Sequence, residues 1–343
     1  MFALNGTKVS IFSYCEKKNS TFHKKIPNYS LSLHPNLYFA IDMNKEFIVL
    51  SRQDAVARNN SPYVNLKVAN NEGVENICVF DVPKTSGPKV GQLVRFLTIR
   101  DNQGKKSATN MDMIAGTFPT ENHSLYNMVP RPIKREVWDA TIEALIGFCK
   151  DEKLIDFIRK QADELFPKYS KYPAATSVHH AFPGGLLNHT YQMLHLLEGI
   201  YPVYPYPDDI KIERIIISIL FHDWGKLCEY NVEGEKLENG FLLGHIYMSA
   251  NYLNNLLRDL YTDAGGKISE ADKREINFIV HCVLAHHGQL EFGSPVLPCI
   301  PEAQLLNYID NISAKADIFI TTGHMEKAFA LGTSVVKDQL PNN

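Results

Sequence analysis

A change in the spacing of the apolar residues near residue 117 constrains the fold of this chain more than any other sequence feature. Before that point, apolar and polar residues alternate in short runs, as in YVNLKV at 63–68. After it, apolar residues recur every three or four positions. A period of two is typical of half-buried strands, and a period near 3.6 is typical of amphipathic helices. The sequence therefore predicts a β region followed by an α region.

The β region is predicted to contain five short strands, at 47–56, 63–68, 74–82, 93–99 and 107–114. Turn-forming sequences separate them, among them NNSP at 59–62, NNEG at 70–73 and DNQG at 101–104. Five strands of this length suit a small β-barrel of the OB-fold type. Residues 1–45 are expected to be an N-terminal extension, mainly irregular, with a strand or two at most.

The α region is predicted to be a bundle of helices at 137–150, 152–165, 186–200, 209–221, 243–260, 273–287 and 302–320. The fold class is accordingly multidomain α and β. We expect an OB-fold-like barrel at 46–118, a proline-containing linker at 119–135, an all-α helical bundle at 136–330 and a C-terminal tail at 331–343.

Composition argues against a membrane or secreted protein. The run IIISILF at 215–221, apolar except for Ser218, is far shorter than the roughly 20 residues that cross a bilayer. The first residues lack the positive cluster and apolar stretch of a secretory signal. The six cysteines stand singly without a CxxC pair, which disfavours a zinc ribbon or a disulfide framework. We expect a soluble cytoplasmic protein with no membrane partner.

The net charge of −3 is unevenly distributed. Residues 1–135 hold 18 Lys and Arg against 10 Asp and Glu, a net charge of +8, and the remainder carries −11. A basic front region suggests contact with a polyanion, although two ordinary solvated surfaces would give the same numbers. Histidine is skewed the other way, since 10 of 13 lie at or after His179. The α region thus collects the groups that bind metals or transfer protons.

Most of these groups fall on faces of the predicted helices that should be buried. His189 and His286 extend apolar stripes, and Asp310 directly follows one. Burying ionisable groups costs free energy unless they are paired or coordinated. Any one of them alone would be an ordinary core or surface residue, but a shared metal centre is the economical explanation for the whole set. The set comprises His189, His222, Asp223, His245, His286 and Asp310.

The order His189, His222-Asp223 and Asp310 resembles the HD superfamily of metal-dependent phosphohydrolases, and His245 and His286 resemble its dinuclear branch. The likeness narrows to the YhaM-type 3′-to-5′ exoribonucleases, which place an OB-fold ahead of an HD domain. It spans residues 45–320 and rests on VHHAFPGGLLNH at 178–189, FHDWGK at 221–226, LGH at 243–245, AHHGQLEFGSP at 285–295 and YIDN at 308–311. Two positions depart from the family pattern: Asn188 replaces a frequent Glu, and Trp224 an aliphatic residue.

The resemblance implies a dinuclear metal site. His189, His222, Asp223 and Asp310 would hold one ion, and Asp223 would bridge to a second ion held by His245 and His286. Imidazole and carboxylate ligands favour Mn²⁺, with Fe²⁺, Co²⁺, Zn²⁺ and Mg²⁺ as alternatives. Two ions about 4 Å apart can activate water and orient a scissile phosphate.

Four residues are predicted to take part in catalysis: Asp223, Lys226, His287 and His180. Lys226 would contact a phosphate oxygen, although a lysine just past a helix end also complements the helix dipole. His287 could be a ligand, a proton donor or an orienting neighbour. His180 and its neighbour His179 could contact the phosphate, protonate the leaving group or serve only as structural loop residues.

Six residues of the β region are predicted to bind nucleic acid: Arg58, Tyr63, Lys67, Arg95, Lys105 and Lys106. OB-folds bind single strands through a basic groove with aromatic platforms. Each of these residues, taken alone, could also be an ordinary surface residue.

The sequence thus predicts a metal-dependent phosphodiesterase that removes nucleotides from the 3′ end of single-stranded RNA, with single-stranded DNA as a further substrate. One alternative is an HD phosphohydrolase of a small or cyclic nucleotide, with a regulatory barrel. A second is a non-catalytic nucleic-acid-binding protein, which the complete ligand set disfavours. A homo-oligomer is left open.

Overall fold

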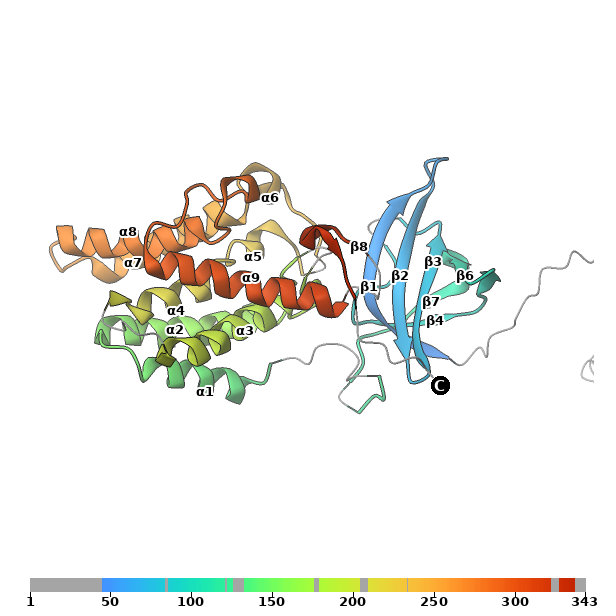
Figure 1. Cartoon of the computed structure of the whole chain (residues 1–343), viewed down its shortest axis with the longest axis horizontal. Helices are drawn as coiled ribbons and strands as arrows, with labels where there is room; N and C mark the ends of the chain where they lie inside the picture. Colours follow the sequence, from blue (N-terminus) through green and yellow to red (C-terminus); the bar gives the residue numbers. More distant parts are fainter. Residues whose placement is uncertain are drawn as a thin grey trace, which may run out of the picture. The chain divides into compact units, whose positions relative to one another are not determined.

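The computed structural model describes residues 45–83, 86–120, 122–125, 133–175, 179–203, 209–232, 234–321 and 327–336. They form a curled β-sheet followed along the chain by a helical region (Figure 1). The predicted fold class, an OB-fold-like β region before a helical α region, is confirmed. Apart from Lys45, the predicted N-terminal extension lies outside the described residues.

Seven of the described strands pair into one open sheet in the order β5-β6-β3-β2-β1-β4-β7. β3 and β6 run parallel, while the other neighbouring pairs are antiparallel. The strands are β1 (Glu46–Val56), β2 (Pro62–Asn70), β3 (Gly73–Phe80), β4 (Leu93–Phe96), β5 (Arg100–Asn102), β6 (Lys105–Thr109) and β7 (Met113–Ala115).

The sheet has two more strands than the sequence predicted. The strand expected at 107–114 is divided into β6 and β7 by the 3-10 turn Asn110–Asp112, where Thr109 Oγ1 donates to Asp112 Oδ2 at 2.7 Å. β5 forms a hairpin with β6 around Gln103 and Gly104, both at positive φ. β5 was missed because its three residues are polar and exposed, so they show no period.

The two faces of the sheet differ as the alternation in β2 predicts. Val64, Leu66 and Val68 are buried in the core of the β region, whereas Tyr63 and Lys67 lie on the opposite, outer face. At one end of the outer face, Ile48, Ala69 and Leu93 form a second small cluster with Leu125. Leu125 belongs to the predicted linker 119–135, so part of that segment packs on the sheet. Residues 121 and 126–132 of the linker lie outside the described residues.

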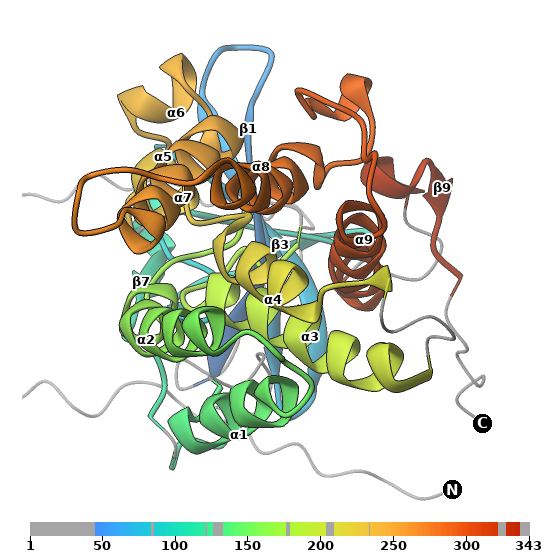
Figure 2. The same ribbon diagram turned by 90° about the vertical axis from the view of Figure 1, so that its left-hand side faces the viewer.

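The described helices form the α region, viewed along the bundle in Figure 2. They are α1 (Arg135–Ile146), α2 (Glu152–Tyr169), α3 (Gly185–Ile200), α4 (Ile212–Phe221), α5 (Lys226–Glu229), α6 (Glu238–Leu242), α7 (His245–Tyr261), α8 (Glu270–Ala285) and α9 (Pro301–Thr321). Seven correspond to predicted helices, whereas α5 and α6 were not predicted because four or five residues are too few to establish a helical period.

Helix α4 occupies the centre of the α region. It contacts α2, α3, α7, α8 and α9, and its residues from Ile215 to Phe221 are all buried. A helix that is apolar on nearly every side of its last two turns is stable only where neighbours surround it. The residues that follow its last turn therefore emerge inside the bundle, which places His222 and Asp223 in the protein interior.

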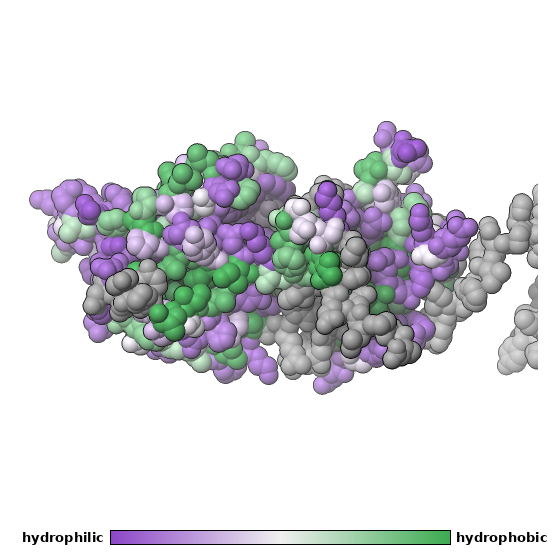
Figure 3. All heavy atoms as spheres, viewed as in Figure 1, coloured by the Kyte–Doolittle hydropathy of each residue, from purple (hydrophilic) through white to green (hydrophobic). Residues whose placement is uncertain are grey.

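Beyond α9, the short strands β8 (Lys327–Ala328) and β9 (Thr333–Ser334) form a hairpin. Ala328 and Val335 pack against Ile318 of α9. β9 falls within the predicted C-terminal tail, so this part of the tail is folded, and residues 337–343 lie outside the described residues. No described helix has the length and apolar character needed to span a membrane. In the view of Figure 3, the helical region also presents apolar side chains at its surface.

Candidate metal centre

The first half of the centre joins three parts of the α region. His189 lies in α3, His222 follows the last residue of α4, and Asp310 lies in α9. His189 Nε2 is 3.2 Å from His222 Nε2 and 3.1 Å from Asp310 Oδ1. Asp223 Oδ2 completes the group at 3.3 Å from His222 Nε2. Residues far apart in sequence thus bring two imidazoles and two carboxylates together.

Hydrogen bonds fix which nitrogen each of the two imidazoles presents. His222 Nδ1 donates to the carbonyl of Ile219 at 2.9 Å. His189 Nδ1 lies 2.9 Å from the Ser313 hydroxyl, which itself donates to Gln192 Oε1 at 2.7 Å and therefore accepts from the histidine. Both Nε2 lone pairs then face the same point. Two lone pairs at this distance repel unless a proton or a cation lies between them.

The second half consists of His245, His286 and His287, whose ligand atoms lie within 4.8 Å of one another. Each again uses Nδ1 as a donor. His286 donates to the carbonyl of Val283 at 2.6 Å, and His287 donates to the carbonyl of Phe292 at 2.7 Å. His245 donates to a carboxylate, described below. Fixing Nδ1–H in this way is how proteins orient histidine ligands toward a metal.

Asp223 lies between the two halves. Its Oδ2 faces His222, and its Oδ1 is 3.6 Å from His245 Nε2 and 4.0 Å from His286 Nε2. Within the described residues, Asp223 Oδ1, His245 Nε2 and His286 Nε2 are buried without a hydrogen-bond partner. A buried polar atom without a partner costs about 1–3 kcal/mol. Divalent cations fit this donor set, because they would supply the missing partner to all three atoms.

Electrostatics at the centre favour added positive charge. Burial alone would raise the pKa of Asp223, but Lys226, His222 and His245 hold that pKa well below its usual range. Burial of Asp310 is likewise outweighed by its hydrogen bond to His189, so the pKa of Asp310 is low. Both carboxylates are therefore ionised at neutral pH. Burial lowers the pKa of His286 well below its usual value, which keeps this ring neutral and able to bind a metal.

A close backbone contact holds Asp223 next to His245. Gly225 packs so tightly on the backbone of His245 that a Cβ atom there would overlap the His245 carbonyl oxygen. The Gly225 N–H also donates to Ser249 Oγ of α7 at 2.8 Å. The turn that carries Asp223 is thereby anchored to α7, whose first residue is His245.

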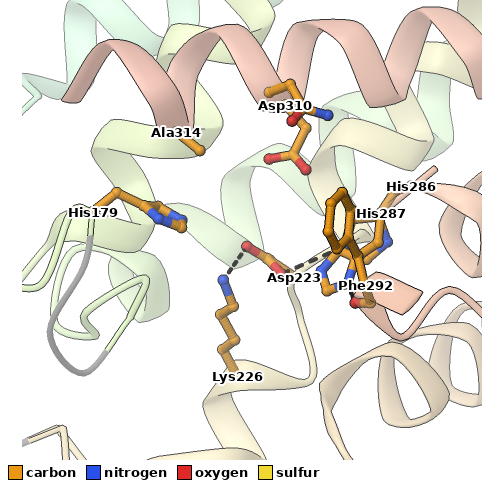
Figure 4. Close-up of a pocket in the computed structure, with 9 residues that line it drawn as sticks. His179, Asp223, Lys226, His286, His287, Phe292, Asp310 and Ala314 are labelled. Atoms are coloured by element: carbon orange, nitrogen blue, oxygen red, sulfur yellow. Dashed lines mark hydrogen bonds and ion pairs between the residues drawn. The ribbon is translucent and has the colours of Figure 1, made fainter. Parts of the chain in front are cut away.

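A cavity of about 230 Å³ opens on the centre. Asp223 and Asp310 lie at its middle in Figure 4, with His179 and Lys226 on one side and His286, His287 and Phe292 on the other. Asn311 and Ala314 of α9 complete the wall. The Lys226 ammonium is 2.6 Å from Asp223 Oδ2. Because only 8% of the residue is exposed, Lys226 is not an ordinary surface lysine.

The structure separates the two neighbouring histidines before α3. His179 lines the cavity, whereas His180 does not and is 1% exposed. His180 Nε2 pairs with Gln192 Oε1 at 3.1 Å, and its backbone N–H donates to Asp317 at 2.8 Å. The prediction of a catalytic role therefore finds better geometric support at His179 than at His180. Burial lowers the pKa of His179 to about 3, so this ring is neutral at pH 7.

Sequence reasoning missed Glu229, the last residue of α5. Its Oε2 accepts the His245 Nδ1–H at 2.8 Å, and its Oε1 pairs with Lys236 at 2.9 Å. Burial would raise its pKa, but these two partners lower the pKa to about 2. The side chain is therefore a carboxylate that orients His245. In the sequence, the only indication of its role was its position three residues after Lys226. The helix that carries both residues is too short to be predicted from an apolar period.

The two departures from the family pattern lie beside the centre without lining its cavity. Asn188 is buried in α3. Trp224 stacks on Tyr252 of α7, with ring centroids 3.6 Å apart and planes within 5°. Trp224 thus fills the space between the turn after α4 and α7 and reaches none of the candidate ligands.

The six predicted nucleic-acid-binding residues are spread over β2, β4, β6 and the β1–β2 turn. Tyr63 and Lys67 share the outer face of β2, where Tyr63 packs against Phe80 with ring centroids 6.0 Å apart. Arg95 pairs with Glu46 at 3.4 Å, and Lys106 pairs with Glu75 at 2.8 Å. Arg58 and Lys105 are exposed, in the β1–β2 turn and at the start of β6. Phe80, 41% exposed, was not predicted as part of this surface.

Comparison of the sequence with known protein families agrees with a metal centre at this site. The family model for the HD domain matches residues 186–315, which hold every candidate ligand described above. This region is an HD domain. The HD domain thus comprises α3 to α8 and most of α9.

Two relatives that each align with 80% of this chain agree with the predicted resemblance. The 3′-5′ exoribonuclease YhaM of Bacillus velezensis (strain DSM 23117 / BGSC 10A6 / LMG 26770 / FZB42) is 27% identical over 284 residues, covering 80% of this chain and 85% of that protein. The 3′-5′ exoribonuclease YhaM of Bacillus subtilis (strain 168) is 26% identical over 281 residues, covering 80% and 86%. No solved structure gives a significant match. The predicted resemblance to YhaM-type proteins is confirmed over 80% of this chain.

Proposed function

We propose that the protein is a metal-dependent 3′-to-5′ exonuclease that hydrolyses the terminal phosphodiester of single-stranded RNA. The observation that carries the proposal is the position of Asp223 between two groups of histidines whose Nε2 atoms converge on it. Such an arrangement suits hydrolysis of a phosphate ester. The exoribonuclease relatives, which cover 80% of this chain, support RNA as the substrate.

The donor set supports two divalent ions. His189, His222 and Asp310 would hold one ion, His245 and His286 the other, and Asp223 would bridge them. His287 is a further candidate for the second ion, because one of its ring nitrogens belongs to the same group of ligand atoms. Nitrogen and carboxylate donors without a thiolate favour Mn²⁺ over thiolate-preferring metals. Two such ions, when bound, would activate water and neutralise charge on the transferred phosphate.

The side chains around the cavity divide the remaining work. The Lys226 ammonium lies beside Asp223 and would attract a phosphate oxygen into the same place. The neutral imidazole of His179 can accept a hydrogen bond from the substrate, but its low pKa makes it a weak base and leaves it without a second ring proton to donate at pH 7. The burial of Asp223 and His286 keeps bulk water from screening these interactions.

We further propose that the outer face of the sheet binds the strand. Tyr63 and Phe80 offer two adjacent rings for base stacking, and Lys67 lies on the same face of β2. The net charge of +8 in residues 1–135 supports attraction of a polyanion. Single-stranded DNA would fit the same surface, because stacking and phosphate contacts do not require a 2′-hydroxyl.

The test is digestion by the full chain with Mn²⁺ of 5′-labelled RNA, 5′-labelled single-stranded DNA, duplex RNA and free mononucleotides. We expect a ladder that shortens from the 3′ end of RNA and is lost after chelation. Asp223→Asn serves as the inactive control. Turnover of mononucleotides with intact RNA would contradict the proposal and favour a small-nucleotide phosphohydrolase.

A further inference from the structure

Phe292 is an apolar ring that faces solvent at the catalytic cavity. It lines the cavity with Asp223 and His287 and is nevertheless 62% exposed. Within the described residues it belongs to none of the hydrophobic core clusters. The ring therefore contributes little to folding through burial, and its position at the cavity calls for another explanation.

The backbone beneath this ring is held firmly. Phe292 ends the 3-10 turn Leu290–Phe292, and its carbonyl accepts the His287 Nδ1–H at 2.7 Å. Gly293 follows at φ 89°, a conformation that side chains disfavour, and Ser294 Oγ donates to the carbonyl of Leu284 at 3.0 Å. The turn is thus tied to a candidate metal ligand and to α8, while the side chain stays exposed.

Phe292 carries the one hydrocarbon ring among the described residues that line the cavity. Lys226 and His179 lie on one side of Asp223, and Phe292 lies on the other (Figure 4). A nucleotide has a charged phosphate at one end, which suits the Lys226 ammonium, and a flat, largely apolar base at the other, which suits the Phe292 ring. With a phosphate oxygen on the Lys226 ammonium, a nucleotide that extends across Asp223 would bring its base to the ring.

We propose that Phe292 is the stacking platform for the base of the 3′-terminal nucleotide. This inference rests on the proposed exonuclease function and names the subsite that holds the leaving nucleotide. An exonuclease must accept every base in turn, and stacking on an aromatic ring tolerates any base because each one has a flat face. Purines, with the larger face, should bind better than pyrimidines.

The experiment compares RNA ending in adenosine with the same RNA ending in an abasic ribose. In the wild-type chain with Mn²⁺, kcat/KM should favour the adenosine substrate by on the order of 10-fold. Phe292→Ala should bring this ratio close to unity, mainly by raising KM for adenosine, and Phe292→Trp should preserve it. Leu290→Ala is the matched control, because Leu290 belongs to the same turn and is 58% exposed but does not line the cavity.

A binding measurement tests the stacking role of Phe292 without requiring RNA cleavage. RNA with 3′-terminal 2-aminopurine is titrated with the Asp223→Asn chain, which should not cleave it. Stacking should quench the fluorescence, and adding Phe292→Ala should abolish the quenching at saturation. If the Phe292→Ala chain cleaves RNA and still prefers adenosine over the abasic ribose, the stacking role of Phe292 is contradicted, while the exonuclease function is not. A wild-type chain that leaves RNA uncut would instead contradict the exonuclease function, and with it the platform.

Discussion

The HD domain and the outer face of the sheet are proposed to contact the same strand, yet their functional groups are arranged differently. His189, His222 and Asp223 are at most 3% exposed and lie within hydrogen-bond or ion-pair distance of one another. In the β region, Arg58 is exposed in the β1–β2 turn, Lys105 is exposed at the start of β6, and Arg95 pairs with a neighbouring glutamate. The buried groups can act only as a unit, whereas the exposed groups can act additively. Loss of one residue should therefore be severe in the first region and mild in the second.

The largest effect is expected for Asp223→Asn. The change keeps the shape of the side chain but removes the charge that faces both histidine groups. Phosphodiester hydrolysis should fall below detection, and the content of bound metal should drop. Kinetics and elemental analysis of the purified chain check both outcomes. Full activity with two ions retained would show that Asp223 does not bridge the centre.

Gly225→Ala should come next. The added methyl group would overlap the backbone of His245, so the turn carrying Asp223 must move away from α7. We expect both lower thermal stability and strongly reduced activity, measured by calorimetry and turnover. Gly199→Ala is a suitable control, since a Cβ atom at Gly199 would meet no other atom within 4 Å. Equal behaviour of the two variants would contradict the close packing.

Glu229→Gln should have an intermediate effect that separates positioning from ligation. Glutamine accepts the His245 hydrogen bond more weakly and cannot add charge to the imidazole. Metal affinity should fall by about 10- to 100-fold, as is typical when a partner of a histidine ligand is changed. Titration with Mn²⁺, followed by its paramagnetic resonance signal, measures this without turnover, and excess Mn²⁺ should restore hydrolysis. Exposed Glu238, in α6, is the control position, where the same change should leave the affinity unaltered.

The smallest effect is expected for Lys67→Met on the sheet. One lost phosphate contact should make the logarithmic salt dependence of strand binding shallower by about 0.7. Binding of single-stranded RNA, measured by anisotropy across a salt series, tests this. Hydrolysis of bis-p-nitrophenyl phosphate should be unchanged, because this minimal diester has no strand that could bind to the sheet. An unaltered salt slope would place the strand elsewhere.

The sequence determined the order of the two regions and most elements, because burial of an element leaves a period that can be detected along the chain. The period of two in β2 and the apolar run of α4 both correspond to the observed burial. Short polar elements such as β5 and α5 leave no such period, so they emerged only from the structure. The candidate ligands were predicted from their order and from a family resemblance, since each histidine alone was uninformative.

Only the tertiary structure decided which side chains meet. The sequence places His179 and His180 side by side, but packing directs the first to the cavity and the second to Gln192. Glu229 is 16 residues from His245 along the chain, and the approach of Gly225 to α7 helps bring them together. Phe292 was not singled out in the sequence, and only the packing shows that it is exposed at the cavity. A period along one element reports burial, whereas contacts between elements depend on how helices pack, which the sequence does not display.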